Sequence, residues 1–88
     1  MTRFFMHLRG GSDEFMDPEG IEMPLAGVAS AALRAARDCI AWDVRDGLLD
    51  MNYRIDVNDE VGTLVYALRF SDAVAFTPLR DHLRLIPA

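Results

Sequence analysis

The chain has 88 residues, half of them apolar, and carries a net charge of −5 from fourteen carboxylates against nine basic side chains. This length predicts a single domain with a modest core, and the acidic balance argues against binding to the phosphate backbone of nucleic acids. No apolar run approaches the roughly 20 residues of a membrane span, and residues 1–7 lack the pattern of a signal peptide. We therefore expect a cytoplasmic protein with no membrane contact.

The first expected strand covers residues 3–9, where apolar and polar side chains alternate. Phe4, Met6 and Leu8 fall on one face, which we expect to pack in the core. The other face is expected to be partly exposed, including its histidine. Together with one arginine of a later strand, this face supplies a candidate open-face patch, which consists of Arg3, Phe5, His7, Arg9 and Arg54.

Turn signals follow this strand. The pair Gly10-Gly11 predicts a tight turn, and residues 15–16 form a short apolar piece. Residues 17–20 read Asp-Pro-Glu-Gly, which fits a type I turn. Asp accepts hydrogen bonds at the first position, Pro presets φ at the second, and Gly closes the fourth. Residues 21–23 are expected to continue as an extended edge segment.

An Ala-rich segment, residues 25–47, predicts one long helix, because apolar residues recur at helical spacing and Gly47 supplies a left-handed C-cap. Apolar residues form two stripes on nearly opposite sides of this helix. The first stripe, expected to cover a sheet, comprises Ala29, Leu33, Ala36, Ile40 and Val44. The second stripe comprises Val28, Ala31, Ala35, Cys39 and Trp42.

The second stripe predicts a contact with a partner, because a helix that lies on a sheet buries only one of its sides. We expect it to be the interface of a homodimer, since small alanines let two helices approach closely and tryptophan often anchors interfaces. Two alternatives remain open. The apolar residues Leu79, Leu83 and Ile86 could fold back over Trp42 within the same chain, or the stripe is simply exposed.

The second half of the chain predicts two further strands. Residues 53–57 alternate again, residues 58–62 form a hairpin loop, and residues 63–70 return as a strand. Alternation alone does not decide which face of this last strand points toward the core. Residues 1–75 are expected to form the domain and residues 76–88 a tail, in which Thr77-Pro78 favours the start of a short helix.

The predicted order is strand, short strand, helix, strand, strand (β-β-α-β-β). The economical architecture is α+β, a small antiparallel sheet with one long helix packed on one face. The expected core joins the first helical stripe to six inward-facing strand residues. These are Phe4, Met6, Leu8, Ile55, Leu64 and Leu68.

No residue pattern indicates catalysis or a metal site. His7 has no Ser, Cys or second His near it in the sequence that would complete a nucleophile and base pair. The acidic residues around Gly20 do not have the spacing of a calcium loop, and the single Cys39 cannot form an internal disulfide. We therefore expect a non-catalytic chain with no cofactor, no metal and no catalytic residues.

Three segments carry a resemblance to a known family. Residues 3–11 form an Arg-Phe-Phe-x-His-Leu strand with a glycine turn, residues 17–20 an Asp-x-Glu-Gly turn, and residues 57–74 a strand pair. In this order they resemble a family of small bacterial proteins of unknown function. The resemblance implies the order of strands and helix and a bacterial cytoplasmic setting, and it implies no activity.

These observations predict an uncharacterised small protein that acts by binding. The favoured function is a protein-interaction module that works as a homodimer, with room for a further, unidentified protein partner. The alternative is a nucleic-acid-associated or antitoxin-like regulator, although the acidic charge makes a nucleic-acid partner the less favoured one.

Overall fold

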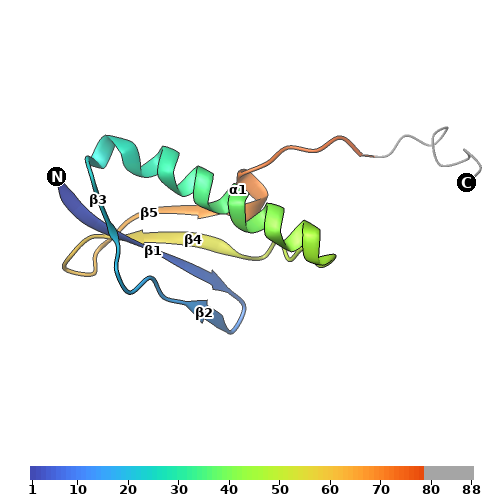
Figure 1. The fold of residues 1–88 in the computed structure, drawn as a ribbon, viewed down its shortest axis with the longest axis horizontal. Coiled ribbons are helices and arrows are strands. Elements are labelled where there is room, and N and C mark those ends of the chain that lie inside the picture. The colour runs from blue at the N-terminus through green and yellow to red at the C-terminus, as the bar shows by residue number, and fades with distance from the viewer. Residues whose placement is uncertain (79–88) are drawn as a thin grey trace, which may run out of the picture.

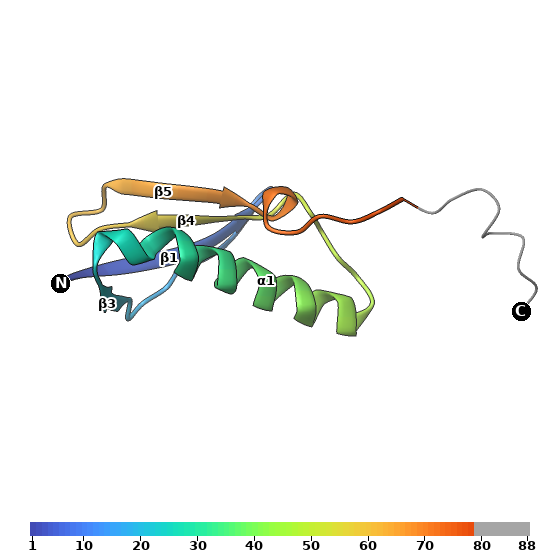
Figure 2. The same cartoon turned by 90° about the horizontal axis from the view of Figure 1, so that it is seen from above.

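The structure, a computed structural model of the chain, describes residues 1–78. These residues form an antiparallel sheet with one long helix lying across one of its faces (Figure 1, Figure 2). The arrangement is the α+β fold that the sequence predicts. The short helix expected to begin at Thr77-Pro78 was predicted mainly for residues 79–88, which lie outside the described residues.

The sheet contains five strands, because the segment expected to be merely extended, residues 21–23, pairs as a strand of its own. The strand order is β2-β1-β4-β5, and β3 pairs with β1 as well. In chain order the strands are β1 (Thr2–Gly10), β2 (Asp13–Phe15), β3 (Ile21–Met23), β4 (Arg54–Asn58) and β5 (Leu64–Arg69).

Strands β2 and β3 are two halves of one interrupted outer strand, since both pair with β1 in the antiparallel sense. Phe15 stands opposite Leu8, and Ile21 stands opposite Phe4. Residues 16–20 therefore have only residues 5–7 opposite them, and the two surplus residues push this stretch out of the ladder. We call residues 16–20 the bulged segment.

The helix α1 (Val28–Asp46) follows a 3₁₀ turn, Leu25–Gly27, and ends where the sequence predicts. Gly47 adopts a φ of 86°, and its N–H donates to the carbonyl of Val44 at 3.1 Å. Only glycine takes this conformation without strain, which explains why the helix stops at this residue.

The helix buries a row of residues different from the first predicted stripe. The buried row is Val28, Ala32, Ala36 and Ile40. Ala36 and Ile40 lie in the core as expected, whereas Ala29 and Val44 are exposed and Leu33 is half-buried. The prediction for Ala29 and Val44 is therefore wrong, because α1 crosses the strands at an angle and its last turns draw away from the sheet (Figure 2).

The sheet contributes its half of the core from β1, β4 and β5. Phe4, Ile55 and Leu68 are buried as predicted, and Met6 and Leu8 are half-buried against them. Leu64 is exposed and does not belong to the core, so its predicted place there is wrong. In β5 it is Tyr66 and Leu68 that face the helix, opposite Val57 and Ile55 of β4.

Candidate functional site

The candidate open-face patch lies on the sheet face opposite α1, and its five residues come from β1 and β4. The structure corrects one of them. His7, expected to be partly exposed, is only 6% exposed. The reason is the bulged segment, which lies over this side of the sheet and contacts the histidine ring. The sequence gives no local sign of this cover, because it depends on the register between β1, β2 and β3.

Asp17 ties the bulged segment to β1. Its N–H donates to Nδ1 of His7 at 3.0 Å, and its Oδ2 accepts the N–H of Met6 at 3.1 Å. Its Oδ1 accepts the N–H groups of Glu19 and Gly20 at 3.2 and 3.0 Å, as expected of Asp at the first position of the turn. The carboxylate thus takes the place of the strand carbonyl that the bulge removes from β1.

The pKa of the Asp17 carboxyl is lowered from its ordinary value of 3.8. Burial opposes this shift, but hydrogen bonds from the N–H groups of Gly20, Met6 and Glu19, with the attraction of His7, outweigh it. The ionised form is therefore more stable in the folded protein than in the unfolded chain. This contribution to stability is complete above about pH 5 and is lost as the pH falls through the pKa of the folded state.

We expect Asp17→Asn to lower the free energy of unfolding by about 1–2 kcal/mol at pH 7, because an amide cannot accept all the N–H groups that the carboxylate accepts. The difference from wild type should shrink between about pH 5 and pH 2, where the wild type protonates Asp17. Urea denaturation at several pH values measures both effects. Glu22→Gln, in an exposed pair with Arg3, is the control and should change little. Parallel pH profiles for wild type and Asp17→Asn would contradict this role.

Asp56 of β4 stands directly opposite His7 and is 4% exposed. Its carboxylate accepts hydrogen bonds from Nη1 of Arg9 at 2.8 Å and from Nε of Arg54 at 3.1 Å. Arg9 also lies 3.4 Å from the carboxylate of Glu14 on β2. A buried carboxylate is tolerated only when it is paired, and the two guanidinium groups supply that pairing. The open face therefore carries an ion-pair network whose acidic and basic side chains pair with one another within the chain.

This network does not have the geometry of a reaction centre. Nδ1 of His7 already accepts a backbone hydrogen bond, and the carboxylate of Asp56 is engaged by two arginines. Within residues 1–78, no group of three or more His, Cys, Asp or Glu side chains is placed to hold a metal ion. No helix in that range is long and apolar enough to cross a membrane. That the chain is not an enzyme, and that it is cytoplasmic, remain predictions.

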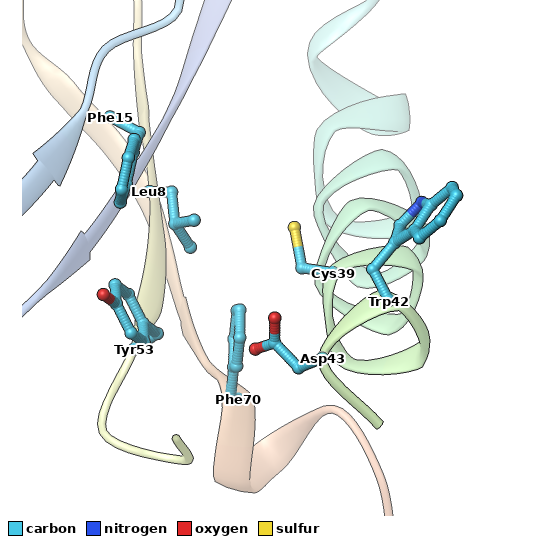
Figure 3. A pocket seen from close by; sticks show the side chains of 7 residues that line it. All are labelled: Leu8, Phe15, Cys39, Trp42, Asp43, Tyr53 and Phe70. Carbon is cyan, nitrogen blue, oxygen red and sulfur yellow. The ribbon is translucent and has the colours of Figure 1, made fainter. Parts of the chain in front are cut away.

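A cavity of about 320 Å³ lies between the sheet and the C-terminal half of α1 (Figure 3). In this view Cys39 and Asp43 of the helix face the strand side chains, while the Trp42 indole points away from the sheet. The cavity exists because the last turns of α1 diverge from the sheet (Figure 2). Its walls are formed by Leu8, Phe15, Cys39, Trp42, Asp43, Tyr53 and Phe70.

Carboxylates lie in and around this cavity. The pKa of the Cys39 thiol is raised by burial and by the negative charges of Asp43 and Asp38. The pKa of the Tyr53 hydroxyl is raised by its hydrogen bond to Asp13, 2.9 Å long, and by further nearby carboxylates. The carboxylates that contribute to both shifts, among them Asp13, Asp38 and Asp43, disfavour additional negative charge beside the cavity.

The candidate interface stripe does not form one exposed face. Val28 lies in the core, and Ala31, Ala35 and Cys39 are half-buried along the side of the helix. Trp42 alone is strongly exposed, at 63%, and the guanidinium of Arg45 lies 5.3 Å from the centre of its ring. The part of the stripe available to a partner is therefore its C-terminal end, next to the cavity.

The edge of β5 is a second candidate surface, which the sequence analysis missed. β5 is the last strand of the sheet, and within residues 1–78 nothing pairs with its outer side. Five consecutive apolar residues occupy this strand, and several remain accessible. These are Leu64, 55% exposed, Val65, 37% exposed, and Ala67, also exposed. This surface could have been predicted from the sequence, because residues 64–68 form an unbroken apolar run, which is typical of a strand covered on both sides.

Comparison with known proteins shows the family to which the chain belongs. A family model described as "Domain of unknown function (DUF6894)" matches residues 3–71, well over half of the chain. The resemblance to a family of unknown function is thereby confirmed, and the bacterial setting remains a prediction. No curated protein and no solved structure matches the chain at a significant level.

Proposed function

We propose that this chain, which belongs to the DUF6894 family of domains of unknown function, is a non-catalytic protein-interaction module that acts as a homodimer. The exposed edge of β5 carries the proposal. Its N–H and C=O groups are the natural template for another strand, and an identical edge on a second copy satisfies both sets at once. The result is a two-fold symmetric contact in which one sheet continues through both protomers.

The side chains of β5 support this pairing. Edge strands of monomers are usually protected by charges, proline or short length, whereas residues 64–68 are all apolar. Pairing two copies would cover Leu64 and Val65, which are 55% and 37% exposed. The hydrophobic gain from this burial favours association on top of the backbone hydrogen bonds.

Charge complementarity also favours two antiparallel copies of β5. One end of the strand carries Arg69, and the loop at the other end carries Asp59 and Glu60. In an antiparallel pair, the Arg69 end of one protomer lies beside the acidic loop of its partner. Arg69 pairs with Asp72 of its own chain at 3.1 Å but keeps most of its side chain exposed, so it can also meet the acidic loop of the partner, and this contact would add modestly to the preference for the antiparallel orientation.

We expect Val65→Lys to convert the dimer into a folded monomer, because it places a cation at the edge where the two strands meet. Sedimentation of both proteins at about 100 μM measures the change, and circular dichroism verifies the fold. Val44→Lys places the same charge on an exposed position of α1 and is the matched control, expected to stay dimeric. A wild-type chain that is monomeric at this concentration would contradict the proposal.

The same experiment distinguishes the two candidate interfaces. If Trp42→Glu dissociates the dimer and Val65→Lys does not, the copies associate through the end of the helical stripe rather than through β5. The nucleic-acid alternative has less support, because Arg3, Arg9 and Arg54 each lie within 3.5 Å of a carboxylate. Salt-dependent binding to a nucleic acid would favour it.

A further inference from the structure

The cavity between α1 and the sheet lies apart from the proposed dimer contact, since none of the residues that line it belongs to β5. Four of its seven lining side chains are aromatic. Phe15 and Trp42 remain more than half exposed, whereas Phe70 is buried. A volume of about 320 Å³ lies at the lower end of the range for ligand pockets, so the cavity suits a small organic compound.

The rings of Tyr53 and Phe70 form an aromatic corner on the sheet side of the cavity (Figure 3). Their centres lie 5.9 Å apart, and their planes are inclined by 35°. The Tyr53 ring packs directly on the backbone at Gly10 of β1, where a Cβ atom would collide with it, so the missing side chain makes room for the ring. The faces of aromatic rings carry partial negative charge and attract cations.

Asp43 of α1 places a carboxylate on the opposite side of the cavity, facing the strand side chains (Figure 3). Its side chain is half-buried, and the ion pairs within residues 1–78 all involve other carboxylates. The pKa of the Cys39 thiol is raised by burial and by Asp43 and Asp38, so the thiol stays neutral at pH 7 and Asp43 is the charged group of the wall. Charge complementarity therefore favours a positively charged occupant.

We propose that this cavity binds a small organic cation, an ammonium group attached to an aryl or short alkyl body. The ammonium pairs with the carboxylate of Asp43 and lies near the ring faces of Tyr53 and Phe70. The apolar body packs against Leu8 and Phe15. A cation without an apolar body would leave these walls in contact with water, and a neutral compound of the same shape would leave Asp43 without a partner. Tight binding thus requires both properties.

Titration calorimetry of the full-length protein at pH 7 tests the proposal. The probe is phenethylamine, which is an ammonium ion at this pH, and 2-phenylethanol is its uncharged counterpart of the same shape. We expect phenethylamine to bind with a dissociation constant below about 1 mM and the alcohol to bind at least about tenfold more weakly. Asp43→Asn should weaken the binding of phenethylamine about tenfold and leave that of the alcohol unchanged.

The matched control is Asp46→Asn, which removes one charge from an exposed residue of the same helix that does not line the cavity. This variant should bind phenethylamine as wild type does, and urea denaturation midpoints verify that both variants are folded. Val65→Lys should leave the affinity unchanged whether or not the chain dimerises. The outcome is therefore independent of the contact through β5.

Four outcomes would overturn the proposal. A wild-type dissociation constant above about 1 mM would mean that the cavity is not a site for this class of compound. Comparable affinity for the alcohol would indicate an apolar cavity without preference for a cation. An unchanged affinity in Asp43→Asn would exclude the proposed ion pair, and an equal loss in Asp46→Asn would point to general attraction by an acidic chain. The alternative that Leu79, Leu83 and Ile86 cover Trp42 concerns positions outside the described residues.

Discussion

Phe70→Ala is expected to lower the free energy of unfolding by about 3–5 kcal/mol, a large share of the stability of a domain this small. The Phe70 side chain is 1% exposed, and its ring centre lies 5.9 Å from that of Tyr53. Its N–H donates to the carbonyl of Tyr53 at 2.9 Å, so the backbone is held in place as well. Alanine would enlarge a cavity that the helix and the sheet already leave open, and little can collapse into the space.

Urea denaturation of both proteins gives the loss directly. Phe76→Ala removes the same side chain at a position that is 81% exposed, and it serves as the matched control, with an expected change below about 0.5 kcal/mol. Equal losses for the two variants would mean that Phe70 does not hold the last strand against the core.

Asp56→Ala is expected to lower the free energy of unfolding by about 3 kcal/mol, since removal of one partner leaves a largely buried guanidinium without its counter-ion. The effect is largest for Arg9, because only 23% of its side chain is exposed and water cannot replace the lost carboxylate fully. Arg54 is about half exposed and can be solvated instead, and Glu14 still compensates part of the charge of Arg9. These two facts place the expected loss at the lower end of the range for buried pairs.

The matched control for this substitution is Asp72→Ala. Asp72 pairs with Arg69 at a similar distance, 3.1 Å, but both side chains are mostly exposed. We expect its removal to cost less than about 1 kcal/mol. Equal losses of unfolding free energy for Asp56→Ala and Asp72→Ala would mean that the ion-pair network on the open face stabilises the fold no more than an exposed ion pair does.

The elements of this fold were predictable because their signals are local. Alternation over residues 3–9 and the glycine after α1 each specify one element without reference to the rest of the chain. The row of helical residues that meets the sheet was not predictable. Apolar residues surround this helix on most sides, so periodicity alone admits several rows. A row of every fourth residue also drifts by about 40° per step, so the crossing angle decides which residues are buried.

The site was less predictable than the fold. The residues of the open-face patch were placed on the correct face, yet the burial of His7 depends on the bulged segment, which comes from a different part of the chain. The role of Asp56 was not predictable from the sequence, because it depends on pairing with Arg9, 47 residues away. The cavity follows from the divergence of α1 from the sheet, a property of packing that no short stretch of sequence encodes (Figure 2).

The interruption between β2 and β3 makes the two edges of the sheet unequal. The outer edge of β1 is covered by two strands of three residues each, which are separated by a segment that contains Pro18. The first of these strands, β2, carries the charges of Asp13 and Glu14. Such an edge cannot accept a further strand along its length. Two chains joined through β5 would therefore present only blocked edges to the solvent. In such a dimer, growth by strand addition would end at two copies, and the exposed apolar strand would not lead to open-ended filaments.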